Sequence, residues 1–206
     1  MTQEYRPLKL TNIRHFVVLG NILLKLSILT SLCVIIGVIF DIEELYAPIY
    51  NTGTSLQIAI LAGLLVISAS GSGIYNCKNK LHFLPLIVFL YTAISLFYDY
   101  GISIDSFVSR NFQLQHLGII NITSFGIVSK IEIMLVSISL LLGWLKYWKC
   151  ESIFLYLATF IPFNMFISYI VGNLYIVNLM GLWTILITGF LAWGLLFKHT
   201  HRKHLR

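Results

Sequence analysis

Charged side chains are scarce in this 206-residue chain, at only 11% of residues. A soluble domain of ordinary composition carries about 25%. The chain is therefore expected to be almost entirely membrane-spanning, with no room for an additional soluble domain. Nucleic acid binding is a poor alternative, because no folded basic surface remains to carry it.

Reactive motifs are also missing. The chain has three cysteines, Cys33, Cys77 and Cys150, and no CxxC pair, which argues against a thiol-oxidising membrane enzyme. There is no GxxxxGK[ST], HExxH, GxSxG or paired-carboxylate signature. No two histidines lie deep in facing apolar stretches. The sequence therefore predicts no catalytic residue, no metal ligand and no cofactor.

Apolar residues make up most of what is present, with 58% hydrophobic residues and a mean hydropathy of +0.86. A helix that crosses a membrane needs about 20 such residues. The apolar stretches predict six transmembrane helices, at residues 16–40, 54–76, 83–99, 127–148, 152–173 and 179–197. The predicted fold is an all-α integral membrane protein of three tandem αα-hairpins in one domain, residues 1–206.

The positive charges are concentrated in alternate connections. Of the fourteen Lys and Arg, all but Lys25, Arg110 and Lys130 lie before the first stretch, after the last, or in the second and fourth loops. Loops on the cytoplasmic side carry the excess of positive charge. We therefore expect both termini in the cytoplasm of a bacterial inner membrane, with the basic ends beside anionic lipid headgroups.

Polar residues recur near the outer level of the predicted helices and their loops. The expected ligand-binding residues are Asp99, Lys130, Glu132, Asp105, Gln57, Thr184 and Asn173. Ionisable groups in a membrane are costly and should face the bundle or water. The competing interpretation is an interfacial belt of polar and aromatic residues. Lys130 and Glu132 are two apart and point to different faces, so each needs another partner. Asp99 is the candidate for Lys130.

Other polar and small residues favour simpler interpretations. Lys25 is expected to extend its amine toward the cytoplasmic side; a relay is the alternative. Two stripes of small residues predict close helix contacts in lipid. They are Asn164, Ser168 and Gly172 in the fifth stretch, and Thr184, Thr188 and Ala192 in the sixth. The histidines after residue 198 are expected to lie in a solvated basic tail.

Two short segments carry a family resemblance. Tyr98, Gly101, Ile104 and Asp105 resemble a motif that follows the third helix in membrane sensor regions ahead of bacterial histidine kinases and GGDEF diguanylate cyclases. Gly126 and Ser129 match part of a second motif that opens the fourth helix there, whereas its Arg, Met, Pro, Asn and Thr are replaced. The resemblance implies a sensory role and a cytoplasmic tail joined to an output domain. This chain reaches Arg206 without such a domain, which implies either an isolated sensor module or a separate partner.

These patterns favour a non-enzymatic sensor or signal-coupling module that binds a small or lipidic ligand from the outer face. Its expected partners are membrane lipids and a cytoplasmic or membrane signalling protein, and it is compatible with a homo-oligomer. Two other functions stay open. One is a small transporter or channel, although the middle of the predicted bundle is mostly apolar. The other is a membrane enzyme that acts on a lipid or quinone, which would need the Asp99, Lys130 and Glu132 group.

Overall fold

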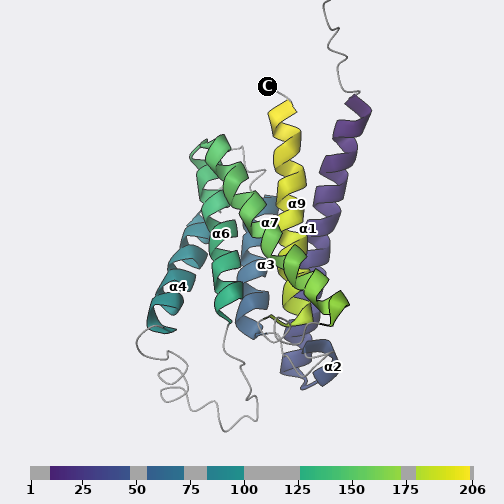
Figure 1. Cartoon of the computed structure of the whole chain (residues 1–206), viewed down its shortest axis with the longest axis vertical. Coiled ribbons are helices and arrows are strands. Elements are labelled where there is room, and N and C mark those ends of the chain that lie inside the picture. Colours follow the sequence, from purple (N-terminus) through teal and green to yellow (C-terminus); the bar gives the residue numbers. More distant parts are fainter. Residues whose placement is uncertain (1–9, 47–54, 72–82, 100–125, 173–179, 205–206) are drawn as a thin grey trace, which may run out of the picture.

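The structure is a computed structural model that describes residues 10–46, 55–71, 83–99, 126–172 and 180–204. These residues form seven α-helices and no strand (Figure 1). The helices are α1 (Leu10–Ile39), α2 (Glu43–Tyr46), α3 (Leu56–Gly71), α4 (Phe83–Asp99), α6 (Ile127–Trp144), α7 (Trp148–Val171) and α9 (Leu182–His204). The predicted all-helical class is confirmed for this part of the chain.

Four of the helices are long and apolar enough to cross a membrane. The qualifying segments are His15–Ile39, Ile127–Trp144, Trp148–Val171 and Leu182–His199. The described parts of α3 and α4 are apolar but shorter, at 16 and 17 residues. Large apolar side chains stay exposed on the outside of the bundle, among them Phe97, Phe160 and Ile170. Such a surface is expected where lipid rather than water surrounds the protein.

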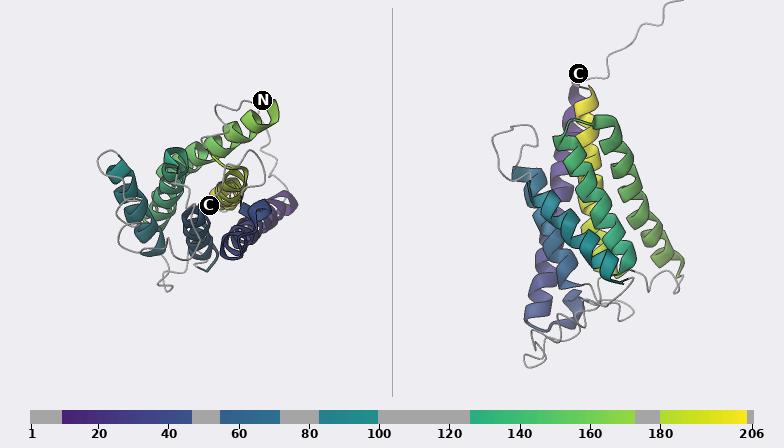
Figure 2. Two further views of the ribbon diagram at one scale, coloured as in Figure 1. Left: turned by 90° about the horizontal axis from the view of Figure 1, so that it is seen from below. Right: turned by 90° about the vertical axis from the view of Figure 1, so that its left-hand side faces the viewer.

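The six longer helices run up and down in alternation (Figure 1). The bundle end where α1 begins and α9 ends is called the proximal end below, and the opposite end the distal end. Each helix packs on the next in the pairs α1–α3, α4–α6 and α7–α9. Viewed along the bundle, α9 lies among α1, α3, α6 and α7, whereas α4 lies at one edge (Figure 2).

The core runs through the whole bundle, and each long helix supplies at least one fully buried aliphatic side chain. Examples are Val34, Leu65, Val88, Val136, Leu155 and Leu191. Helix α1 makes its most extensive contact with α9. There Leu24 meets Gly194, and the Ser27 hydroxyl donates a hydrogen bond to the Ile187 carbonyl oxygen at 2.8 Å. The two helices are antiparallel, so Ser31 lies at the level of Trp183 and Thr184.

Several helix boundaries differ from the sequence prediction, among them the start of α1 at Leu10 instead of residue 16. The turn after α6 falls at Leu145–Tyr147, earlier than expected, because Lys146 takes a left-handed conformation with φ of 64°. No glycine marks that turn, so its position is hard to predict from residue types. Helix α9 continues to His204, seven residues beyond the predicted end at 197. The histidine at 199 is consequently part of a packed helix and not of a solvated tail.

The predicted small-residue stripe on α9 is confirmed, since Thr184, Thr188 and Ala192 are all buried. The stripe on α7 is wrong. Asn164 is exposed and Ser168 is only half-buried. Their side chains bond to their own helix instead: Asn164 Nδ2 donates to the Phe160 carbonyl at 2.7 Å, and Ser168 Oγ to the Asn164 carbonyl at 2.9 Å. Because these bonds satisfy the polar atoms locally, that face of α7 can lie against lipid.

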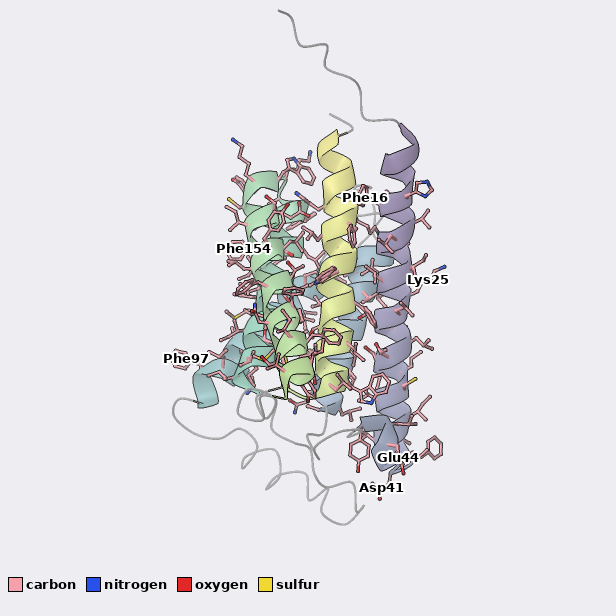
Figure 3. The ribbon with its side chains drawn as sticks, turned by 45° about the vertical axis from the view of Figure 1, so that its right-hand side comes forward. Phe16, Lys25, Asp41, Glu44, Phe97 and Phe154 are labelled. Atoms are coloured by element: carbon pink, nitrogen blue, oxygen red, sulfur yellow. The ribbon has the colours of Figure 1, made fainter. Side chains whose placement is uncertain are left out.

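At the distal end the chain folds back sharply onto α1. Asp41 has a φ of 54°, and the Ile42 N–H donates to the Gly37 carbonyl at 2.8 Å. Helix α2 then packs so closely that a Cβ on Gly37 would lie 2.6 Å from the Leu45 Cβ. The acidic side chains of Asp41 and Glu44 are therefore held at the distal surface (Figure 3).

Candidate functional site within the helix bundle

Helix α6 carries two charged residues into the interior of the bundle. Lys130 and Glu132 lie in its first two turns and are 3% and 0% exposed. Side chains two residues apart point about 200° around a helix from one another. Both can be buried because α6 packs on α3, α4, α7 and α9 together. A buried charge of this kind in a membrane is a functional hypothesis by default.

Glu132 lies beside Thr188 of α9. The Thr188 hydroxyl donates its hydrogen to the Thr184 carbonyl oxygen at 2.8 Å. Within the described ranges, neither carboxyl oxygen of Glu132 has a hydrogen-bond partner of normal geometry. Buried polar atoms are nearly always hydrogen-bonded in proteins, so two open oxygens on one fully buried side chain are unusual.

More buried polar groups lie nearby on α1 and α9. The Ser31 hydroxyl and the Trp183 indole N–H also lack partners among the described residues. The register set by Ser27 and Ile187 places Ser31 at the level of Trp183. The distal half of the bundle therefore combines an open carboxyl, an open hydroxyl and an open indole N–H, on α6, α1 and α9 respectively.

The structure brings three of the seven predicted ligand-binding residues into the bundle: Lys130, Glu132 and Thr184, all buried. Gln57 is half-buried in the first turn of α3, where its backbone N–H donates to Ser55 Oγ at 3.2 Å. Asp99 is the last residue of α4, and its side chain is outside the described part. Asp105 and Asn173 also lie outside it. An Asp99–Lys130 pair stays a prediction.

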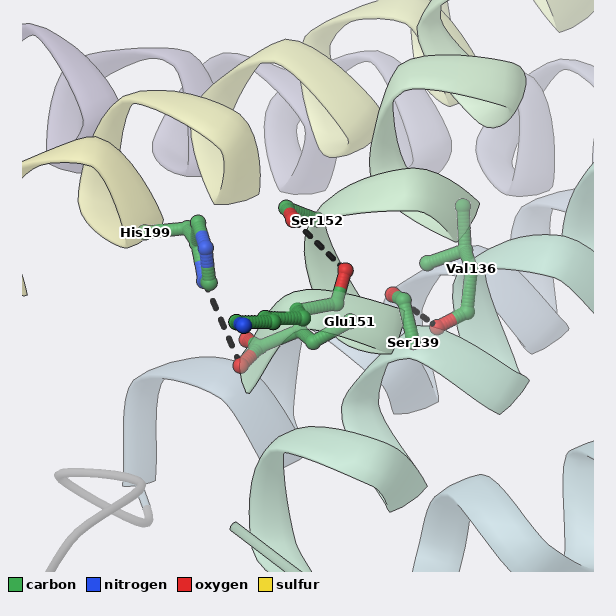
Figure 4. A network of polar contacts seen from close by, with 6 residues as sticks. Val136, Ser139, Glu151, Ser152 and His199 are labelled. Carbon is green, nitrogen blue, oxygen red and sulfur yellow. Dashed lines mark hydrogen bonds and ion pairs between the residues drawn. The ribbon is translucent and has the colours of Figure 1, made fainter. Parts of the chain in front are cut away.

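Sequence reasoning missed a second polar cluster, at the proximal end. Glu151 in the first turn of α7 and His199 near the end of α9 are 4% and 7% exposed. His199 Nδ1 lies 3.2 Å from Glu151 Oε2 (Figure 4). Next to them, Lys198 Nζ donates to the Ala69 carbonyl of α3 at 3.4 Å. These contacts hold the end of α9 to α7 and α3.

The missed cluster depends on a glycine. A Cβ on Gly143 of α6 would lie 2.8 Å from the Glu151 carboxyl carbon. The bare backbone of α6 thus makes room for the carboxyl group, which is directed toward α9. A sequence signal did exist, namely an acid at the start of one apolar stretch and a histidine at the end of another. Both looked like ordinary surface residues of a membrane interface.

Lys25 takes a different position from the buried charges. It is exposed on α1 and points away from the bundle (Figure 3). This orientation agrees with a lysine that lies along the lipid-facing surface and not with a relay through the interior.

An apolar groove of about 300 Å³ lies between α1, α7 and α9. Its lining is almost wholly hydrocarbon and aromatic, with Pro162, Phe163 and Trp193 among the contributors. It contains no group that could hold a polar substrate. Over the described part of the chain, no three His, Cys, Asp or Glu side chains are grouped as a metal site would require.

The fold and the exposed apolar surface define an all-helical protein with the features of a membrane protein. No protein-family model matches the chain, and no curated protein or solved structure matches it significantly.

Proposed function

We propose that the chain is a six-span protein of a bacterial inner membrane with both termini in the cytoplasm. Four helices have the length and composition of membrane spans, and α3 and α4 run alongside them in the same bundle. The helix ends that carry most of the positive charge are at the proximal end. This favours a cytoplasmic location for that end. The acidic Asp41 and Glu44 are at the opposite end.

Cys150 offers a direct test of this topology. It is exposed at the start of α7, close to the proximal end. In a variant that keeps only this cysteine (Cys33→Ser, Cys77→Ser), a membrane-impermeant maleimide should label inverted membrane vesicles and spare intact spheroplasts. The reverse pattern would place the proximal end outside and overturn the orientation.

Within this topology, we propose a sensor or signal-coupling module that binds a small or lipidic ligand from the distal, outer side. The supporting observation is the course of α9. One unbroken helix carries Thr188 beside Glu132 of α6, and Lys198 and His199 in the proximal cluster. A ligand that separates α6 from α9 at the distal end would shift α9 as a whole. The shift would then reach the two polar contacts, made by Lys198 and His199, at its proximal end.

The coupling can be tested with native membrane lipid extract as the probe. In nanodiscs, wild-type protein should retain a component of the extract, detected by native mass spectrometry, and its binding should change the rate of Cys150 labelling. Glu132→Gln and Lys130→Met should lose both effects. Glu44→Gln changes an exposed residue of α2. It is the matched control and should keep both the retained component and its effect on labelling. Equal retention and equal labelling in all four proteins would overturn the sensory role.

A second candidate, a transporter for a small cation, is favoured by one specific observation. Glu132 places a carboxyl with two open oxygens inside the bundle. Intramembrane carboxyls are typical of ion pathways. Proton or sodium flux into liposomes that wild-type protein supports and Glu132→Gln abolishes would favour transport over sensing.

A further inference from the structure

Glu132 is the most isolated ionisable side chain in the described structure. It is 0% exposed, and neither oxygen of its carboxyl group has a hydrogen-bond donor there. An ionised carboxylate in such a place has no compensating donor among the described residues, and burial of an unpaired charge is strongly unfavourable. The site therefore favours a carboxyl group that has bound a positive species.

Within the described helices, the residues that could supply this positive charge are few and lie away from Glu132. Helix α3 carries no titratable side chain, and those of α9 begin at Lys198 and His199, which are engaged at the proximal end. Lys130 lies on the opposite face of α6 and has a polar partner of its own. The other titratable groups on helices packed against α6 are Tyr91, Tyr98 and Asp99 on α4, and Lys149, Cys150, Glu151, Tyr156 and Tyr169 on α7.

Thr188 indicates which small species fits. In the structure its hydroxyl donates to the Thr184 carbonyl oxygen, and in this orientation it presents a lone pair to Glu132. A lone pair accepts a hydrogen bond from a protonated carboxyl group, whereas a hydroxyl turned toward Glu132 would donate to a carboxylate. A bound sodium ion would need several oxygen ligands, of which Glu132 and Thr188 would supply two.

We propose that Glu132 is an intramembrane proton-binding site, in which the protonated carboxyl group donates a hydrogen bond to the Thr188 hydroxyl. The site belongs to the interface between α6 and α9. It follows from burial and from the direction of one hydroxyl, so it does not rest on the proposed sensory role. Separation of the two helices would expose the acid and release the proton.

Infrared difference spectroscopy of the full chain in nanodiscs tests the proposal at neutral pH. Wild-type protein should give the carbonyl stretching band of a protonated carboxylic acid, with a shift in D₂O, and Glu132→Gln should lack it. Glu151→Gln, which removes the other buried carboxyl of the described bundle, should retain it. Absence of the band from wild-type protein, or its loss in Glu151→Gln alone, would overturn the assignment.

Two further measurements test the contact with Thr188 and distinguish a bound proton from a bound sodium ion. Thr188→Val should keep the band but move it to higher frequency, because the hydrogen bond to the hydroxyl is lost; an unchanged frequency would contradict the pairing. Dicyclohexylcarbodiimide, which attacks protonated carboxyls in apolar surroundings, should modify Glu132 at equal rates in sodium chloride and choline chloride. Protection by sodium chloride alone would identify a sodium site instead.

Discussion

Gly20 of α1 and Gly194 of α9 face each other with almost no space between their backbones. A Cβ on Gly20 would lie 2.8 Å from the Gly194 carbonyl oxygen, and one on Gly194 would lie 3.0 Å from the Gly20 carbonyl oxygen. Small residues allow this close approach between helices in lipid, where van der Waals packing drives association. The proximal halves of α1 and α9 can thus pack this closely because both positions are glycine and carry no side chain.

Substitution of either glycine should therefore separate α1 from α9. Gly20→Ala and Gly194→Ala should each lower the free energy of unfolding by about 1–3 kcal/mol, as overpacking of a tight contact does. Thermal unfolding in detergent measures the effect. Gly63→Ala is the control, because a Cβ there meets nothing within 4 Å and should leave stability equal or higher. Equal loss in all three variants would refute the tight crossing.

Gly143 and Glu151 should be energetically coupled. A methyl group at position 143 would push the Glu151 carboxyl away from His199. Gly143→Ala should destabilise the wild-type protein more than it destabilises a Glu151→Ala background, with a coupling energy of about 0.5–3 kcal/mol. A double-mutant cycle of unfolding free energies measures this difference. Strictly additive effects would mean that the glycine does not position the carboxyl.

Lys198 should stabilise the proximal end of α3. Its amine contacts the Ala69 carbonyl in the last turn of that helix, where a positive charge is favourable by about 0.3–1 kcal/mol. Lys198→Met should lose this stabilisation, and Lys198→Arg should keep part of it. Lys25→Met is the matched control, since Lys25 points away from the bundle. A larger loss at Lys25 than at Lys198, measured by thermal unfolding, would contradict this role of Lys198.

Ser27 and Thr30 allow an interhelical hydrogen bond to be compared with an intrahelical one. Ser27 Oγ reaches across to Ile187 of α9, whereas Thr30 Oγ1 bonds to Leu26 and Ser27 of its own helix. Ser27→Ala should cost about 0.6 kcal/mol and not more than about 2 kcal/mol, the range for such bonds in membranes. Thr30→Ala should change the unfolding free energy less. The opposite ranking would disprove the role of Ser27 in holding α1 to α9.

The helices could be predicted well because long apolar runs dominate the sequence. The predicted stretch 83–99 has the bounds of α4, and the stretch 127–148 begins where α6 begins. The turn at Lys146 was misplaced because a left-handed lysine has no sequence signal. Whether all six stretches cross a membrane, and in which direction, stays a prediction.

The sequence predicts which residues belong to the candidate site but not which of them contact one another. The sequence points to Lys130, Glu132 and Thr184 because polar groups at the level of lipid are costly unless they face the bundle, and all three are buried in it. This reasoning could not foresee that Glu132 meets Thr188, because this contact depends on the register between two helices far apart in sequence. The Glu151–His199 contact escaped for the same reason, since it requires the end of α9 to reach the turn between α6 and α7.

The central position of α9 also bears on how the bundle is assembled. Helices enter a membrane in the order of their synthesis, and α9 follows all the helices on which it packs. Until α9 is made, the face of α1 that packs on it has no helix partner, and the site between α6 and α9 has one wall. The contacts of α9 with Ser27, Glu151 and Ala69 can therefore form only after the other helices of the bundle have been made.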